Sequence, residues 1–136
     1  MQLVLDSNEY LFAFGVERKP SCQILLRHIV SNPKKFRIRV SRTILEEIQR
    51  NTAAQPFKDI WVFLRTLGVS VDENWEVPFE LGVKYEALGL KPGDAFIAAY
   101  ADWAGVEFLI TENRDFRELH SLPFRVIRAE EFLKEH

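Results

Sequence analysis

Acidic and amide side chains follow two short apolar segments of this chain. Asp6 comes directly after the apolar residues 2–5, and Asn113 and Asp115 come shortly after the apolar run 106–110. Asp94 follows Pro92 in what we expect to be the first turn of a helix, where a negative charge is favourable. Carboxylate and amide oxygens are the ligands that Mg²⁺ and Mn²⁺ prefer. These residue types therefore predict a site for a hard divalent ion, provided that the fold gathers them.

The chemistry that fits such a site is hydrolysis of a phosphodiester. A carboxylate-held divalent ion lowers the pKa of the attacking water and stabilises the leaving oxygen. The three histidines share no zinc-ligand spacing, and the single cysteine, Cys22, cannot form an intrachain disulfide. The chain also lacks a P-loop and a GxGxxG motif, which argues against a nucleotide cradle of either kind.

A glutamate pair in the expected helix 43–50 is a further candidate. Glu47 lies beside the apolar face of that helix, and Glu46 is expected to face water. A pair of this kind is most often a solvated helix face, so the pattern alone leaves the role of Glu47 open. Simpler roles also exist for Asp6, which could cap the helix that follows it, and for Asp94, which could only stabilise a helix start.

The elements around Asp94 explain how distant polar groups could meet. The alanine-rich helix 94–104 ends at Gly105 and spans roughly 16 Å at about 1.5 Å per residue. The strand 106–110 then runs back over a similar distance. The residues that follow this strand should therefore lie at the level of Asp94.

Strand and helix patterns alternate along the rest of the chain. Expected strands are 2–5, 36–40, 69–71, 106–110 and 124–127, and expected helices are 10–14, 22–30, 43–50, 58–67, 78–88, 94–104 and 129–134. This alternation predicts an α/β fold with a mostly parallel sheet. In such a sheet, strand ends and the starts of the following helices share one edge, where the acids would gather.

Length and composition limit the class of protein. The 136 residues predict one domain, 1–136, and 47% apolar with 28% charged residues is typical of a globular protein. The net charge of −2 excludes a global basic field, so contact with nucleic acid would have to be local. The lone cysteine, the lack of a signal peptide and the lack of a run of about 18 apolar residues predict a cytoplasmic protein without a membrane partner.

Four segments resemble the signature blocks of the PIN domain family, in the same order and across nearly the whole chain. They are LVLDSN at 3–8, SRTILEEI at 41–48, GDAFIAAYADWAG at 93–105 and LITENRDF at 109–116. The resemblance implies a three-layer α/β/α sandwich with a central, mostly parallel sheet. It also implies Mg²⁺- or Mn²⁺-dependent cleavage of single-stranded RNA, a homodimer, and the role of toxin beside an antitoxin protein.

The resemblance also assigns roles to individual residues. Asp6, Glu47, Asp94 and Asp115 match the catalytic acids, with Glu47 a better match than Glu46, and Asp6, Asp94, Asn113 and Asp115 match metal ligands. The amide at Asn113 removes one negative charge and leaves open whether one metal ion or two would bind. The remaining matches are supporting polar residues, Ser7, Asn8 and Thr111. Apart from the resemblance, Arg42, Lys91 and Arg114 could hold the RNA backbone, although basic surface residues are common.

Two other interpretations remain at this stage. A PIN-like domain that binds RNA or protein without cleaving is compatible with Asn113 in place of an acid. A receiver-type α/β domain would also hold Mg²⁺ with acids, but it should have an acidic pair near residue 10 and a lysine after the fifth strand. The chain has a lone Asp6 and no such lysine, so this interpretation is disfavoured.

Overall fold

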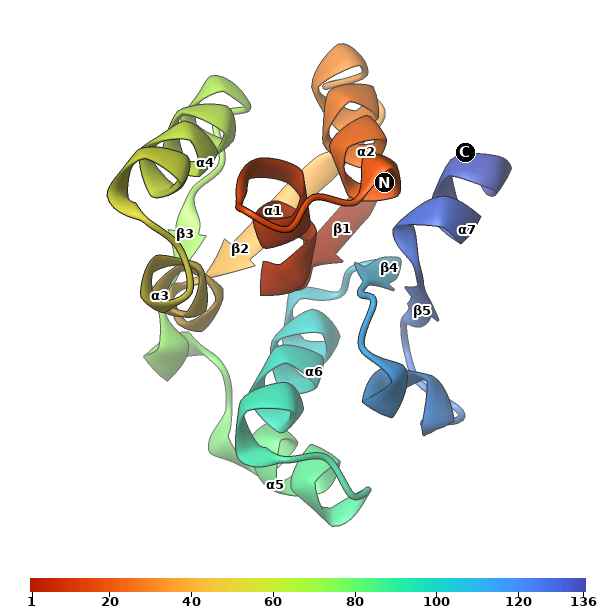
Figure 1. Cartoon of the computed structure of the whole chain (residues 1–136). Helices are drawn as coiled ribbons and strands as arrows, with labels where there is room; N and C mark the ends of the chain where they lie inside the picture. The colour runs from red at the N-terminus through yellow and green to blue at the C-terminus, as the bar shows by residue number, and fades with distance from the viewer.

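The computed structural model describes residues 1–136 and contains one five-stranded sheet in which every pairing is parallel (Figure 1). The strand order is β3-β2-β1-β4-β5. The strands are β1 Gln2–Leu5, β2 Arg37–Ser41, β3 Val71–Asp72, β4 Phe108–Ile110 and β5 Arg125–Ile127. The α/β class and the parallel sheet predicted from the sequence are confirmed.

Helices cover the sheet in two groups, which makes three layers. The α-helices are α1 Ser7–Phe14, α2 Pro20–Ser31, α3 Arg42–Arg50, α4 Ala54–Thr66, α5 Phe79–Ala87, α6 Pro92–Ala104 and α7 Ala129–Glu135, with 3-10 turns η1 Asn74–Glu76 and η2 Arg114–Glu118. Helix α1 packs against α2, α3 and α4, and α7 packs against α2, whereas α5 packs against α6 (Figure 1).

The central strand β1 sets the position of the polar edge. It pairs with β2 on one side and β4 on the other, so that Leu3 lies opposite both Ile38 and Phe108. Leu3, Val4 and Leu5 are fully buried, as expected for a strand that is covered on both faces. Because all three strands run in the same direction, the segments that follow β1, β2 and β4 emerge at one edge of the sheet.

Local signals account for several helix ends. The Ser41 side chain accepts a hydrogen bond from the Ile44 N–H and caps α3. Pro92 occupies the first turn of α6, and Gly105 ends this helix in the left-handed conformation with φ 66°. A side chain at position 105 would be strained in that conformation, so glycine is required by the backbone rather than by lack of space.

Other boundaries differ from the sequence-based expectation. Helix α2 begins at Pro20 rather than at residue 22, because the fixed φ of proline suits a first helical residue. Helix α4 begins at Ala54 rather than Lys58, since Pro56 is tolerated in the first turn. Strand β4 begins at Phe108, because the Val106 N–H still bonds back to α6 through the Ala101 carbonyl.

The interior is one connected apolar cluster of 35 buried residues. Five other buried residues are polar or charged, namely Asp6, Ser7, Glu9, Ser41 and Thr111. Four of the five belong to the segments that follow β1 and β4, and the fifth ends β2. None of the helices combines the length and apolar character that crossing a membrane requires.

Candidate active site

Asp6 stands at the junction of β1 and α1 and is almost completely buried, with 4% of its surface exposed. Its extended backbone makes it the N-cap of α1, and its Oδ1 accepts a hydrogen bond of 2.8 Å from the Ser7 N–H. Its Oδ2 accepts one of 2.7 Å from the hydroxyl of Thr111, the residue after β4. The same carboxylate therefore both caps α1 and bonds to the residue that follows β4.

The environment of Asp6 raises its pKa to about 6 from an ordinary value of 3.8. Burial is the largest cause, because it disfavours the charged form. The hydrogen bonds from Thr111 and Ser7 act in the opposite direction, and the negative charges of Glu47 and Asp94 raise the pKa further. Asp6 is thus an anion held among other anions.

Glu47, on α3, is joined to Asp6 through Ser7. The Ser7 hydroxyl donates a hydrogen bond of 2.9 Å to Glu47 Oε2. The first turn of α6 is also close, because a Cβ atom at Gly93 would lie 3.9 Å from Glu47 Oε1. Glu47 is half-buried, whereas Glu46 is exposed.

Asp94 and Asn113 complete the arrangement from the other side. The Asn113 side-chain amide donates a hydrogen bond of 3.2 Å to Asp94 Oδ2, and the Asn113 backbone N–H donates one of 3.0 Å to the Thr111 hydroxyl. The Asn113 Oδ1 accepts from the Asp115 N–H at 3.0 Å and caps the 3-10 turn η2. Asn113 therefore presents an N–H group, rather than its oxygen, to Asp94.

These bonds form one continuous path from Glu47 through Ser7, Asp6, Thr111 and Asn113 to Asp94. We call the four residues of this path that carry carboxylate or amide groups, Asp6, Glu47, Asp94 and Asn113, the Asp6 site. The structure brings together the predicted acids that follow β1, β2 and the turn before α6. The roles of these residues as catalysts or metal ligands remain predictions.

Some predicted residues lie outside this path. Asp115 is exposed, and only its backbone takes part. Asn8 makes no side-chain hydrogen bond and lines a groove beside Arg50 and Pro56. Arg42 is engaged with Glu73 at 2.7 Å.

The Asp6 site contains no internal counter-charge. None of the ion pairs of the chain includes Asp6, Glu47, Asp94 or Asp115. Gathered carboxylates without a basic partner are costly unless a cation joins them, and an all-oxygen donor set suits Mg²⁺ or Mn²⁺. The residues present therefore fit a hard divalent ion.

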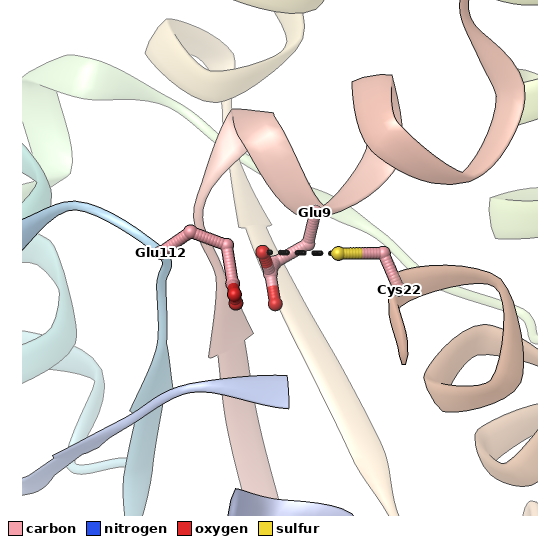
Figure 2. Close-up of side chains that lie close together, drawn as sticks. All are labelled: Glu9, Cys22 and Glu112. Atoms are coloured by element: carbon pink, nitrogen blue, oxygen red, sulfur yellow. Dashed lines mark hydrogen bonds between the residues drawn. The ribbon is translucent and has the colours of Figure 1, made fainter. Parts of the chain in front are cut away.

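A second group of side chains was not anticipated from the sequence. Glu9, Cys22 and Glu112, which we call the Glu9 cluster, bring one potential ligand atom each to within 4.8 Å of one another (Figure 2). The carboxylates of the Asp6 site do not form so compact a set. Two features of the sequence could have pointed to this cluster. One is a glutamate among the residues of α1 that face the interior, and the other is the glutamate next to Thr111.

Comparisons with known proteins support the fold. No protein-family model matches the chain, and no curated protein matches it. Its structure is similar to that of VapBC2 from Rickettsia felis bound to a DNA fragment from its promoter, with a TM-score of 0.66 and 20% sequence identity. The match covers 93% of this chain and 97% of the other. The architecture is thus a PIN-like three-layer α/β/α sandwich, in agreement with the prediction from the sequence.

Proposed function

We propose that this protein is a Mg²⁺- or Mn²⁺-dependent endoribonuclease of the PIN type, acting on single-stranded RNA. The observation that carries the proposal is the hydrogen-bonded path that holds three carboxylates at one edge of the sheet with no basic residue among them. The PIN-like fold and the four sequence blocks add independent support.

Asp6, Glu47 and Asp94 are the residues that would hold the metal ion. When bound there, the ion would lower the pKa of the attacking water and stabilise the leaving oxygen, giving 3′-hydroxyl and 5′-phosphate products. Ser7 and Thr111 orient Asp6 by direct hydrogen bonds. Such partners fix the geometry of ligands, and their loss typically weakens a metal site by about 10- to 100-fold.

Asn113 acts in this proposal as a positioning residue. It donates to Asp94 and is itself held by its backbone bond to Thr111 and by its cap of η2. Its neutral amide leaves less negative charge than an acid would, which favours one tightly held ion over two. Asp115 is exposed and would enter only through a change of its side-chain rotamer.

RNA would approach from the exposed side of the Asp6 site. Lys91, just before α6, and Arg114, just after Asn113, are exposed and take part in no ion pair. Free cations beside the site are suited to hold the phosphate backbone without reading sequence. Arg42 is less suited, because Glu73 already neutralises it.

We further infer that the protein is the toxin component of a toxin–antitoxin pair and forms a homodimer in the cytoplasm. The similar Rickettsia felis structure is of VapBC2 bound to promoter DNA, which supports a protein partner for this fold. Trp75 and Phe79, 81% and 82% exposed, are apolar surface that a partner protein or a second copy would cover.

A specific observation favours a second candidate, a PIN-like domain that binds without cleaving. Asn113 directs an N–H toward Asp94, and this donor partly satisfies an acid that would otherwise need a cation. The two candidates make opposite predictions about metal binding.

The decisive experiment is cleavage of end-labelled, unstructured RNA by the purified protein with Mn²⁺, with EDTA as the control. We expect cleavage with Mn²⁺ and none with EDTA. Mn²⁺ affinity should be measured in parallel by calorimetry on the same preparation. Absence of both cleavage and Mn²⁺ binding would reject the nuclease and favour the binding domain.

A further inference from the structure

The Glu9 cluster joins three segments of the chain. Glu9 lies on α1, Cys22 on α2, and Glu112 in the segment after β4. Glu9 and Cys22 are completely buried, and Glu112 is half-buried. In Figure 2 the carboxyl groups of Glu9 and Glu112 lie next to each other, with the Cys22 sulfur approaching Glu9 from the other side.

The hydrogen bonds of this cluster are incomplete. Cys22 Sγ donates to Glu9 Oε2 at 3.6 Å, and the Ala129 N–H donates to Glu112 Oε2 at 3.1 Å. Glu9 Oε1 has no partner, although it is buried. The nearby Arg128 is paired with Glu131 at 2.6 Å and supplies no ion pair to Glu112.

An unpartnered, fully buried carboxylate oxygen is costly, and a second carboxylate beside it adds repulsion. Burial raises the pKa of the Glu9 carboxyl well above its ordinary value, with Glu112 adding to the effect. Burial also raises the pKa of the Cys22 thiol. Three acidic groups therefore face one another in the interior, and only protons or a cation can relieve them.

We propose that Glu9, Cys22 and Glu112 form a second metal site, specific for a borderline-soft divalent ion such as Zn²⁺ and separate from the Asp6 site. A thiolate selects Zn²⁺ over Mg²⁺ or Mn²⁺, and carboxylates complete such sites. The fourth position of a tetrahedral ion would be taken by water on the half-buried side of Glu112.

The distances fit this ion. With Zn–S of about 2.3 Å and Zn–O of about 2.1 Å, sulfur and oxygen ligands of a tetrahedral zinc lie about 3.6 Å apart. Cys22 Sγ and Glu9 Oε2 are 3.6 Å apart already. The three ligand atoms lie within 4.8 Å of one another, so a side-chain shift of about 1 Å closes the site.

Metal binding here would act on the Asp6 site through the backbone segments that the two groups share. Glu9 lies on the same helix as Ser7, and Glu112 stands between Thr111 and Asn113. An ion that ties these segments together, and both of them to α2, would fix the backbone from which the hydrogen-bonded path starts. Binding would also release the proton of the Cys22 thiol, so affinity should rise with pH.

The test uses Cd²⁺ added to the full-length, metal-free protein, because bonding of a thiolate to Cd²⁺ produces an ultraviolet charge-transfer absorption. We expect this absorption to saturate with a single Cd²⁺ per chain, to persist in excess Mg²⁺, and to be competed away by Zn²⁺. It should persist in Asp6→Asn and disappear in Cys22→Ser and Glu9→Gln. Glu112→Gln, at a half-buried position, should weaken Cd²⁺ binding roughly 10-fold or more without loss of the fold.

Two results would overturn the proposal. One is the absence of a charge-transfer absorption in the folded wild-type protein, which would mean that Glu9 and Glu112 share a proton instead. The other is an absorption that survives Glu9→Gln, a Cd²⁺ affinity that Glu112→Gln leaves unchanged, or an absorption that disappears in Asp6→Asn. Because the readout is spectroscopic and does not require RNA cleavage, failure of this site and failure of the proposed nuclease can be told apart. Circular dichroism of each variant confirms that it is folded.

Discussion

The Asp6 site and the Glu9 cluster draw on the same two segments but differ in how their buried acids are hydrogen-bonded. Both use one acid from the beginning of α1 and one polar residue from the segment after β4. Asp6 receives two strong neutral donors, the Ser7 N–H and the Thr111 hydroxyl. Glu9 receives only a thiol at 3.6 Å and has one oxygen without a partner.

This difference in donors bears on the pKa of each carboxyl. Burial raises the pKa of both carboxyls, but the hydrogen bonds to Asp6 limit its pKa to about 6. Asp6 is therefore mostly ionised at neutral pH and ready to hold a hard cation. Glu9 has only the Cys22 thiol to offset burial, so its pKa stays well above its ordinary value.

The largest expected effect is the loss of nuclease activity in Asp6→Asn. This change removes one charge from the candidate metal ligands, and we expect cleavage to fall on the order of a thousandfold or more. The folded state should be equally stable or slightly more stable, because a desolvated carboxylate is removed. The measurement is a single-turnover rate with Mn²⁺, together with a chemical unfolding curve.

The matched control for that change is Glu46→Gln. Glu46 is exposed on the helix that carries Glu47, so its substitution alters a charge of the same kind outside the Asp6 site. We expect cleavage by Glu46→Gln to equal that of the wild type. If Asp6→Asn and Asp94→Asn both cleaved as well as this control, the assignment of the site would be wrong.

The next effect is on stability as a function of pH in EDTA. The folded-state pKa of Asp6 is raised, so the folded protein holds its proton more tightly than the unfolded chain. The contribution of Asp6 to stability is therefore greatest below its unfolded pKa of about 3.8 and falls until the pH exceeds about 6. A shift of that size corresponds to about 3 kcal/mol at about 1.4 kcal/mol per pKa unit.

Unfolding curves at several pH values test this expectation. Asp6→Asn should remove the part of the decline between about pH 4 and pH 6, with the sign that a raised acid pKa requires. Glu9→Gln should instead remove the part of the decline that Glu9 contributes, because burial raises the pKa of Glu9 as well. If the stability of the two variants depended on pH in the same way, the difference inferred between the Asp6 site and the Glu9 cluster would be contradicted.

The sequence could predict the parts of this arrangement that follow from local patterns and strand direction, but not the parts that depend on tertiary contacts. The edge at which Asp6, Asp94 and Asn113 meet follows from strand direction and from the return of α6 and β4. The helix pattern and the family resemblance already favoured Glu47 over Glu46, but the hydrogen bond from Ser7 to Glu47 depends on tertiary packing. The orientation of the Asn113 amide likewise depends on its cap of η2.

The Glu9 cluster escaped prediction for a different reason. Charged residues are almost never fully buried, so an interior glutamate contradicts the pattern by which core positions are recognised. Its partners Cys22 and Glu112 are far apart in the sequence and share no ligand spacing of a known kind. Local signals were more reliable where one residue decides, as at Pro92 and Gly105, which mark the two ends of α6.

A smaller effect is expected from Thr111→Val, which probes the donor that separates the two regions. Thr111 is fully buried and bonds both Asp6 and the Asn113 N–H. Losing it should reduce cleavage about 10- to 100-fold and stability by about 1–3 kcal/mol. Because the Thr111 bond lowers the pKa of Asp6, the acid limb of the rate profile should move to higher pH.

The comparison for that change is Thr66→Val, in which the lost hydroxyl bonds only the Val62 carbonyl on an exposed face of α4. It should leave the rate and its pH profile as in the wild type. A Thr111→Val enzyme with an unshifted acid limb would show that the hydroxyl does not tune Asp6.

The smallest effect concerns the surroundings of the two regions. The Asp6 site is flanked by the unpaired cations Lys91 and Arg114, whereas Arg128, which precedes the Ala129 that bonds Glu112, is itself bound to Glu131. Lys91→Ala should therefore raise the KM for RNA by roughly 3-fold and lower its salt dependence, since one phosphate contact is lost. Arg128→Ala removes a charge of the same sign but should leave the KM unchanged. Equal effects of the two substitutions would mean that overall charge, rather than a cation placed beside the Asp6 site, attracts the RNA.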